Sequence, residues 1–269
     1  MLGAVHRKDP TVPDNKPRIA WVTGASRGIG YAVARALASQ GWSVAASARN
    51  VADLEGLAAA CVKSPGSVIP FSLDITDEEA AVHTVAQIET QLGPISLAIL
   101  NAGTHEPVDG RALSVPPFRR LMEINYMGTV NCLVPVSERF VARGGGRIAV
   151  VASLAGYRGL PTASAYGASK AALINMCEAL REELRPAGVL LSVITPGFVR
   201  TPLTDQNSFP MPFLIDADAA AQRIVRGLAT DRFEITFPRR FSYLMKLLRI
   251  VPYGLFFAIT RRTMPKGEA

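Results

Sequence analysis

Seven short apolar runs, separated by longer segments of helical pattern, constrain the fold of this chain more than any other feature. The first run is RIAWVTG, from residue 18, and the last is FEITFP, from residue 233. These runs are apolar throughout rather than alternating, which is typical of parallel strands buried on both faces. Strands and helices in alternation predict an α/β fold, a Rossmann-type doubly wound parallel sheet with helices on both faces.

Helix boundaries are marked by residues with known terminal preferences. The segment after the first strand stops at Gly41, as helices often do at glycine. In the segment 76–93 we expect Thr76 to be the N-cap, with Glu79 at the capping-box position. The segment 216–229 opens with acidic residues, which favour a helix N-terminus.

The chain of 269 residues has the length of one α/β domain, and we find neither repeats nor an internal linker. We expect a single domain at 18–238 between a loose leader at 1–17 and a C-terminal extension at 239–269. The leader holds three prolines and lacks the apolar core of a signal peptide. No apolar run reaches the ~18 residues of a membrane-spanning helix. These features indicate a cytoplasmic protein.

The net charge of +7 is concentrated in one segment. Residues 239–266 carry seven cations and no acid, so the rest of the chain is near neutral. This distribution argues against a nucleic-acid-binding surface and indicates a local basic feature. The cysteines and histidines are scattered, so we expect buried thiols and no metal site. They are Cys61, Cys132, Cys177, His6, His83 and His105.

A glycine-rich loop, TGASRGIG at 23–30, joins the first strand to the first helix. A helix N-terminus offers unpaired N–H groups and a positive dipole end, which together bind phosphate. Gly24, Gly28 and Gly30 would let the backbone turn tightly and approach a pyrophosphate. Ser26, Arg27 and Ile29 belong to the same cofactor loop. An ordinary glycine-rich turn is the alternative, but the position in the first strand–helix unit favours the nucleotide.

Two arginines indicate which nucleotide binds. The second strand ends in Arg49, near where a carboxylate would select NAD, and Arg27 lies in the glycine loop. Guanidinium groups pair with phosphate, so they favour the 2′-phosphate of NADP(H) over NAD(H), unless both are ordinary surface arginines. Asp74, after the third strand, would cap the adenine edge or start the next helix.

A tyrosine and a lysine four residues apart, Tyr166 and Lys170, would lie on one face of a helix. A nearby ammonium would lower the pKa of the phenol towards a value suited to proton transfer. Ser153 ends the preceding strand and would hold a substrate oxygen. Asn101 ends the fourth strand, and Asn125 lies on the following helix. Structural roles exist for each: a helix cap, an asparagine turn and a buried amide bonded to backbone.

Together these motifs resemble the classical short-chain dehydrogenases/reductases over residues 18–238. The resemblance implies that Tyr166 is the general acid in reduction and the base in oxidation, while Ser153 binds the carbonyl oxygen. Lys170 would bind the nicotinamide ribose and lower the pKa of Tyr166, and Asn125 would hold a relay water. Further cofactor contacts would come from Asn101, Ala102, Gly103, Pro196, Gly197 and Thr201.

The same resemblance implies a strand order of 3-2-1-4-5-6-7 and a homodimer or homotetramer built on the fourth and fifth helices. Together with Arg27 and Arg49, it implies an NADP(H)-dependent oxidoreductase acting on a carbonyl or secondary alcohol. The alternative is a catalytically silent NADP-binding regulator with the same fold. The intact Ser153, Tyr166 and Lys170 favour the enzyme.

Two apolar segments bear on the substrate. The expected substrate loop after Gly197 is apolar, which favours a hydrophobic or lipid-like substrate, unless its side chains pack on the protein itself. Its apolar residues are Phe198, Leu203, Phe209, Met211, Phe213 and Leu214. The tail run IVPYGLFFAI has basic flanks, and residues 239–266 would contact an anionic membrane, cover the pocket or form a subunit contact.

Overall fold

The computed structural model describes residues 18–205 and 211–261. The expected leader at 1–17 therefore lies outside the described residues. So do Phe209 of the expected substrate loop and the last two cations of the tail, Arg262 and Lys266.

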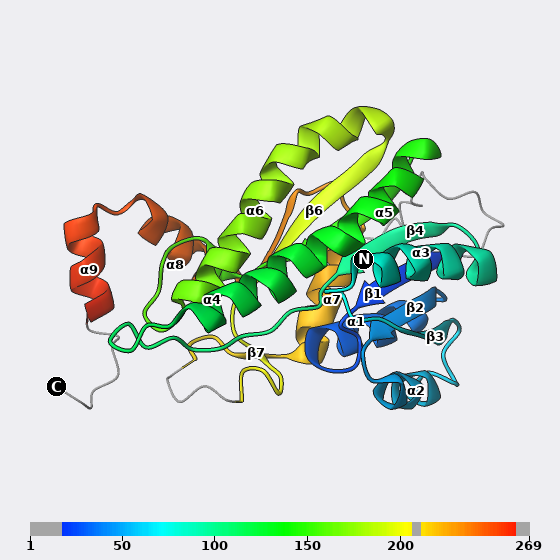
Figure 1. Cartoon of the computed structure of the whole chain (residues 1–269), viewed down its shortest axis with the longest axis horizontal. Helices are drawn as coiled ribbons and strands as arrows, with labels where there is room; N and C mark the ends of the chain where they lie inside the picture. Colours follow the sequence, from blue (N-terminus) through cyan, green and yellow to red (C-terminus); the bar gives the residue numbers. More distant parts are fainter. Residues whose placement is uncertain (1–17, 206–210, 262–269) are drawn as a thin grey trace, which may run out of the picture.

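The main sheet has seven strands, all paired in parallel, in the order β3-β2-β1-β4-β5-β6-β9 (Figure 1). This order confirms the predicted Rossmann-type arrangement. The seventh strand is β9 because a separate pair, β7 (Val199–Arg200) and β8 (Ile215–Asp216), lies between β6 and β9 in sequence. The strands of the main sheet are β1 (Ile19–Thr23), β2 (Ser43–Ala48), β3 (Ser67–Ser72), β4 (Ile95–Leu100), β5 (Gly146–Val151), β6 (Val189–Pro196) and β9 (Glu234–Phe237).

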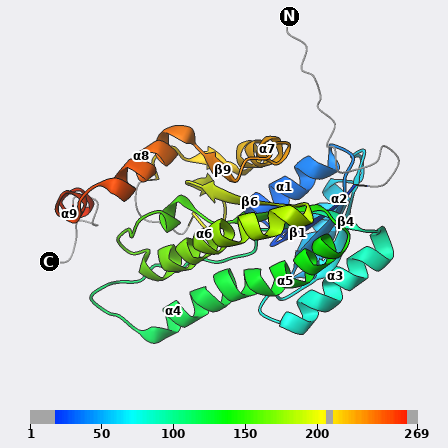
Figure 2. The ribbon, with the colours of Figure 1, turned by 90° about the horizontal axis from the view of Figure 1, so that it is seen from above.

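Helices cover both faces of this sheet, as Figure 2 shows. One face carries α1 (Gly28–Ala38), α2 (Val51–Ala60) and α7 (Ala217–Leu228). The other carries α3 (Glu78–Leu92), α5 (Gly128–Ala142) and α6 (Ser164–Leu184). A short α4 (Val115–Leu121) and a π-helical turn, η1 (Met122–Met127), lead into α5; two 3-10 turns are η2 (Leu154–Gly156) and η3 (Arg185–Ala187).

The first strand shows why its apolar run does not alternate. Ile19 and Trp21 face the core beneath α3, α5 and α6, whereas Ala20 and Val22 face the core beneath α1, α2 and α7. All four are buried. Both faces of a central parallel strand therefore require apolar side chains.

The start of α3 differs from the sequence-based prediction by one residue. Asp77 is the N-cap, and its carboxylate accepts a hydrogen bond from the backbone N–H of Ala80 at 2.9 Å. Thr76, predicted as the cap, instead donates its hydroxyl to Asp74 at 2.8 Å. Glu79 is therefore the second helical residue rather than the third, and the predicted capping box is wrong.

The C-terminal extension forms two helices, α8 (Arg239–Ile250) and α9 (Tyr253–Arg261). They follow β9 and project beyond the end of the sheet as an arm, on the left of Figures 1 and 2. Pro252 interrupts the apolar run between them, because proline cannot continue the hydrogen-bonding pattern of a helix. The run is thus divided between two helices. Among the described helices, none has the length and apolar character needed to cross a membrane.

The turn from β1 into α1 is tight. Gly24 and Gly28 have positive φ angles of 65° and 59°, a conformation that glycine adopts without strain. Gly30 has an ordinary φ, but a Cβ there would overlap the carbonyl oxygen of Gly24 and the side-chain amide of Asn101. The turn therefore excludes side chains for two different physical reasons.

We expect Gly30→Ala to destabilise the protein by about 1–3 kcal/mol, the usual cost of overpacking. Gly56, inside α2, is a matched control because a Cβ there meets nothing within 4 Å. Gly56→Ala should stabilise the protein by about 0.5–1 kcal/mol. Urea unfolding of both variants measures these effects. Equal stability of Gly30→Ala and the wild type would contradict the close approach.

Candidate active site

The glycine turn and the segment after β4 are joined through Thr23, at the end of β1. Its hydroxyl oxygen accepts hydrogen bonds from the backbone N–H groups of Asn101 (3.0 Å) and Ala102 (3.1 Å). The Asn101 amide donates in return to the carbonyl oxygens of Thr23 (3.0 Å) and Gly24 (3.1 Å). Two motifs far apart in sequence therefore meet. Thr23 was missed by the sequence analysis, although its place at the strand end before the glycines was a usable signal.

Asn125 fixes the next part of the same segment. It is fully buried in the π-helical turn η1. Its amide accepts from the backbone N–H of Thr104 at 2.7 Å and donates to the Thr104 carbonyl at 2.9 Å and the Ser169 hydroxyl at 3.0 Å. These are the contacts of a structural amide bonded to backbone. The relay water at Asn125 stays a prediction, and Ser169 is a further residue that the sequence analysis missed.

Helix α6 places Tyr166 and Lys170 together, as their spacing predicts. The Lys170 ammonium nitrogen lies 5.8 Å from the centre of the Tyr166 ring and donates to the carbonyl oxygen of Val151 at 2.9 Å. Ser153 caps η2 by accepting from the backbone N–H of Ala155 at 3.1 Å. It is also hydrogen-bonded to the Tyr166 side chain. The cap and the tyrosine contact therefore coexist at Ser153.

The electrostatics of this cluster are dominated by burial. Burial raises the pKa of Tyr166 above its ordinary value, while the hydrogen bond with Ser153 lowers it. Burial also lowers the pKa of Lys170 to about 8. The net shift of the Tyr166 pKa is upward because desolvation disfavours the phenolate and the Lys170 ammonium is hydrogen-bonded to a backbone carbonyl, so a lowering of this pKa by Lys170 stays a prediction.

The glycine turn and its neighbours fit a nicotinamide dinucleotide. The first turn of α1 has no side-chain cap and no acidic residue, so its N–H groups and positive dipole end suit a pyrophosphate. Gly103 lies against two groups of the cluster around Tyr166: a Cβ there would be 3.0 Å from Asn125 Oδ1 and 3.4 Å from Lys170 Nζ. The segment after β4 therefore contacts the glycine turn at Ala102 and borders Asn125 and Lys170 at Gly103.

The segment after β6 reaches the glycine turn. The N–H of Gly197, just after Pro196, donates to the carbonyl of Phe237 at 2.8 Å, which fixes the strand end. A Cβ on Gly28 would lie 3.0 Å from Thr201 Cγ2. The structure therefore brings Thr201 beside the glycine loop. Its hydroxyl lies 3.3 Å from that of Thr204.

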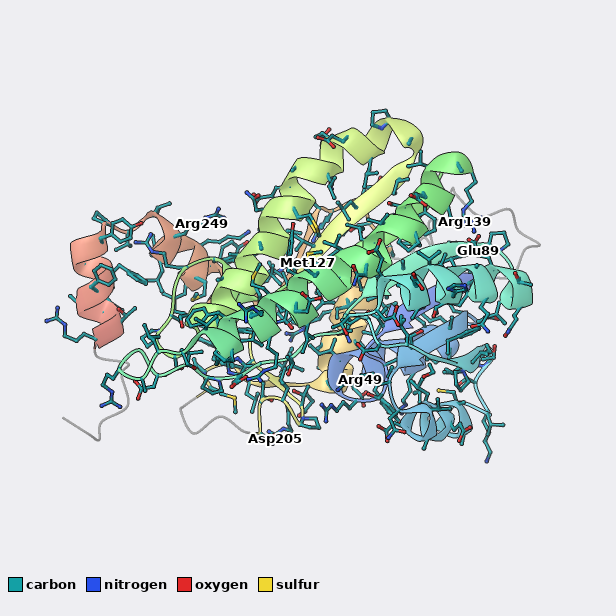
Figure 3. All side chains as sticks on the ribbon, in the orientation of Figure 1. Arg49, Glu89, Met127, Arg139, Asp205 and Arg249 are labelled. Carbon is teal, nitrogen blue, oxygen red and sulfur yellow. The ribbon has the colours of Figure 1, made fainter. Side chains whose placement is uncertain are left out.

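The two arginines expected to select the nucleotide are exposed, and neither has an ion-pair partner within residues 18–205 and 211–261. Arg27 precedes α1 and Arg49 follows β2; Figure 3 shows Arg49 at the surface. Asp74 accepts from the backbone N–H of Thr76 at 3.0 Å, and this bond, with a smaller effect of Arg49, lowers its pKa. Asp74 thus forms the turn before α3.

His105 is a third residue that the sequence analysis did not connect with the site. Its ring meets Tyr166 edge-on, with centroids 4.7 Å apart. Burial lowers the pKa of His105, and its Nδ1 is buried without a hydrogen-bond partner among the described residues. Its position two residues after Gly103 was the available signal. The described residues contain no cluster of His, Cys, Asp or Glu that could hold a metal.

Comparison with known proteins shows the family of this chain. The family model of the short chain dehydrogenases matches residues 18–210. An uncharacterized oxidoreductase of Myxococcus xanthus is 35% identical over 245 residues, which are 91% of this chain and 97% of that protein.

Solved structures agree with this assignment. A short-chain type dehydrogenase/reductase from Mycobacterium marinum is 27% identical, with a TM-score of 0.75, covering 82% of this chain and 92% of its own. An alcohol dehydrogenase from Thermococcus sibiricus, complexed with 5-hydroxy-NADP, is 26% identical, with a TM-score of 0.74, covering 82% of this chain and 96% of its own. This chain therefore belongs to the short chain dehydrogenase family of oxidoreductases.

Proposed function

We propose that this oxidoreductase uses NADP(H) to interconvert a carbonyl compound and a secondary alcohol, with a hydrophobic or lipid-like substrate. The observation that carries the proposal is the convergence of Ser153, Tyr166 and Lys170 beside the glycine turn. A hydroxyl pair, a buried cation and a phosphate-binding turn in one place suit proton transfer coupled to hydride transfer. A catalytically silent regulator would have no use for this convergence.

Each side chain has a role that follows from its position. The cofactor, when bound, supplies or accepts the hydride at its nicotinamide ring. The hydroxyls of Ser153 and Tyr166 would hold the substrate oxygen, and Tyr166 would donate a proton to it in reduction. Lys170 retains donor hydrogens beyond the one used on Val151, because an ammonium has three. These would bind the cofactor ribose and favour the phenolate.

The preference for NADP(H) rests on Arg27 and Arg49. Both guanidinium groups are exposed at the entrance to the glycine turn and lack ion-pair partners among the described residues. A 2′-phosphate would supply the anion that they lack. The Thermococcus sibiricus structure, which holds an NADP analogue, supports the same choice.

An apolar substrate is supported by the aromatic side chains after β6. Phe198 stacks on Phe241 of α8 with centroids 5.7 Å apart, and Phe213 lies 6.0 Å from the same ring. Phe213 nevertheless remains 48% exposed. Part of this segment thus packs on the protein, and part presents an aromatic surface suited to an apolar molecule.

Assembly and location are further parts of the proposal. The continuous helix from α4 to α5 exposes Val115, Met127, Val134 and Val141, an apolar face suited to a homodimer or homotetramer. We place the protein in the cytoplasm, with the arm at the surface of an anionic membrane. The arm exposes eight large apolar side chains: Tyr243, Leu244, Leu247, Ile250, Tyr253, Leu255, Phe257 and Ile259.

Replacing the tyrosine tests the proposed chemistry. We expect Tyr166→Phe to reduce turnover by about 10²-fold or more, because the proton donor is removed. NADPH binding, followed by fluorescence titration, should be retained and shows that the variant is folded. NADPH oxidation with a panel of ketones measures turnover. Turnover within threefold of the wild type would refute the role of Tyr166.

Cofactor selectivity provides a second test. Charge-assisted hydrogen bonds contribute ~1.5–3 kcal/mol, so Arg49→Gln should weaken NADPH binding by about 10-fold or more. NADH binding should hardly change. The matched control is Arg185→Gln, an exposed arginine after α6 that should affect neither cofactor. Equal affinity of the wild type for NADPH and NADH would show that the arginines do not select the phosphate.

Vesicle flotation tests the membrane contact. Basic residues gain ~1 kcal/mol each near an anionic surface, and salt screens this attraction. The wild type should float with vesicles of phosphatidylserine and phosphatidylcholine at low salt, and less at high salt. Leu255→Ser with Phe257→Ser should reduce flotation. Val82→Ser, an exposed apolar residue on α3, should not. If the wild type stays in the soluble fraction with anionic vesicles at low salt, the proposed membrane contact of the arm is wrong.

A further inference from the structure

The segment that follows Ser153 is attached to the C-terminal arm by one arginine. Arg158 lies five residues after Ser153, between η2 and α6. Its guanidinium donates to the carbonyl oxygen of Arg249 at 2.6 Å and to that of Val251 at 3.3 Å. These carbonyls end α8, where the negative end of the helix dipole favours a cation. Arg158 therefore binds the segment that follows Ser153 to the C-terminal end of α8.

The same guanidinium also contacts α9. It lies 4.7 Å from the ring centre of Tyr253 and 4.4 Å from that of Phe256, within the range of cation–π attraction. Phe256 is 4% exposed, whereas Tyr253 is 69% exposed and belongs to the apolar surface of the arm. Arg158 thus connects the segment after Ser153 with a ring that faces away from the protein.

A second set of contacts links the base of the arm, in α8, to this segment. The hydroxyl of Tyr157, next to Arg158, lies 3.0 Å from the Thr195 hydroxyl and donates to the carboxylate of Glu234. Glu234 also pairs with Lys246 of α8. Movement of α8 relative to the sheet therefore acts on the residues that follow Ser153.

We propose that docking of the arm on an anionic lipid surface is transmitted through Arg158 to the active site. In this regulation, docking orders residues 153–163 and raises turnover. The inference rests on the proposed function, whose membrane contact it extends. The occupant is lipid because residues 239–261 carry exposed apolar side chains and five cations but no acidic residue, and the Lys246–Glu234 pair neutralises only one of the five. A second copy of so basic a surface would repel the first.

The physical cause of the transmission is desolvation. Lipid that covers the outer face of Tyr253 removes water from around the guanidinium of Arg158. Cation–π contacts and charged hydrogen bonds both strengthen in a medium of lower dielectric constant. The bound guanidinium then restrains residues 153–163 more firmly, including the cap at Ser153. The hydroxyl that would hold the substrate oxygen is more precisely placed as a result.

Hydrogen–deuterium exchange of residues 153–163 measures this restraint without any substrate. With vesicles of phosphatidylserine and phosphatidylcholine, exchange in the full-length wild type should slow by about fivefold, equivalent to ~1 kcal/mol of added cation–π stabilisation. Vesicles of phosphatidylcholine alone should have little effect. In parallel, kcat for a water-soluble ketone should rise in the presence of the anionic vesicles. A soluble ketone separates this response from delivery of substrate by the lipid.

Arg158→Lys identifies the link, because lysine keeps the charge but cannot bind both carbonyls as a fork. The variant should float with anionic vesicles as the wild type does and lose most of the exchange and kcat response. Arg181→Lys is the matched control. Arg181 also donates to a backbone carbonyl, that of Leu191 at 3.1 Å, and lies 5.1 Å from the ring centre of Phe233, far from α9. The Arg181→Lys variant should show the same exchange and kcat response to anionic vesicles as the wild type.

The outcomes separate this inference from the enzyme assignment. A wild type that floats while exchange at 153–163 is unchanged overturns the transmission. An unaltered response in Arg158→Lys overturns the role of Arg158. A wild type that does not float with anionic vesicles overturns lipid as the occupant of the arm. So does an arm whose hydrogen–deuterium exchange slows only when the protein dimerises at high concentration. In each case Tyr166-dependent NADPH oxidation still tests the oxidoreductase independently.

Discussion

The ends of β1 and β4 approach each other more closely than side chains would allow, and the site is built around this approach. A Cβ on Gly24 would lie 2.7 Å from the Cα of Ala102. At that separation, Thr23 accepts hydrogen bonds from the backbone N–H groups of two partly buried residues, Asn101 and Ala102. The hydroxyl of Thr23 and the glycine that follows it are therefore both required at the end of β1. The phosphate-binding turn and the segment after β4 therefore form as one unit.

The catalytic cluster extends from this unit. Gly103 lies against Asn125 and Lys170, so the same segment that closes the turn also borders the buried ammonium. Burial of a cation with one carbonyl partner opposes folding, since desolvation favours the neutral amine. A negatively polarised group beside the ammonium would offset that cost. Binding of such a group would therefore stabilise the charged form of Lys170.

The sequence predicted those parts of the structure that follow from repeating patterns. Strands buried on both faces leave continuous apolar runs, and these runs predicted the parallel sheet, whereas its strand order was implied by the family resemblance. The spacing of Tyr166 and Lys170 likewise follows from helix geometry alone. The prediction of Thr76 as the N-cap was wrong because Thr76 and Asp77 are both residue types that cap helices. The sequence does not show at which of the two the helical backbone begins.

Contacts between distant segments could not be predicted in this way. His105 lies beside Tyr166 because a loop without periodicity returns to α6. Arg158 binds the arm across more than ninety residues of sequence. The pKa of Tyr166 depends on how much water the fold removes, which spacing does not report. The roles of the site residues, as distinct from their positions, remain predictions.

The arm is compatible with two of the roles that the sequence left open for residues 239–266, contact with the substrate segment and contact with a membrane. At its base, Phe241 stacks on Phe198 and lies near Phe213, so the first turn of α8 covers part of the segment after β6. Towards its tip, Leu255 and Phe257 of α9 face outwards. One end of the arm therefore packs on the segment after β6, the expected substrate loop, while the other offers an apolar, basic surface. For a lipid-like substrate, this arrangement would place the aromatic residues of the site next to the membrane from which the substrate comes.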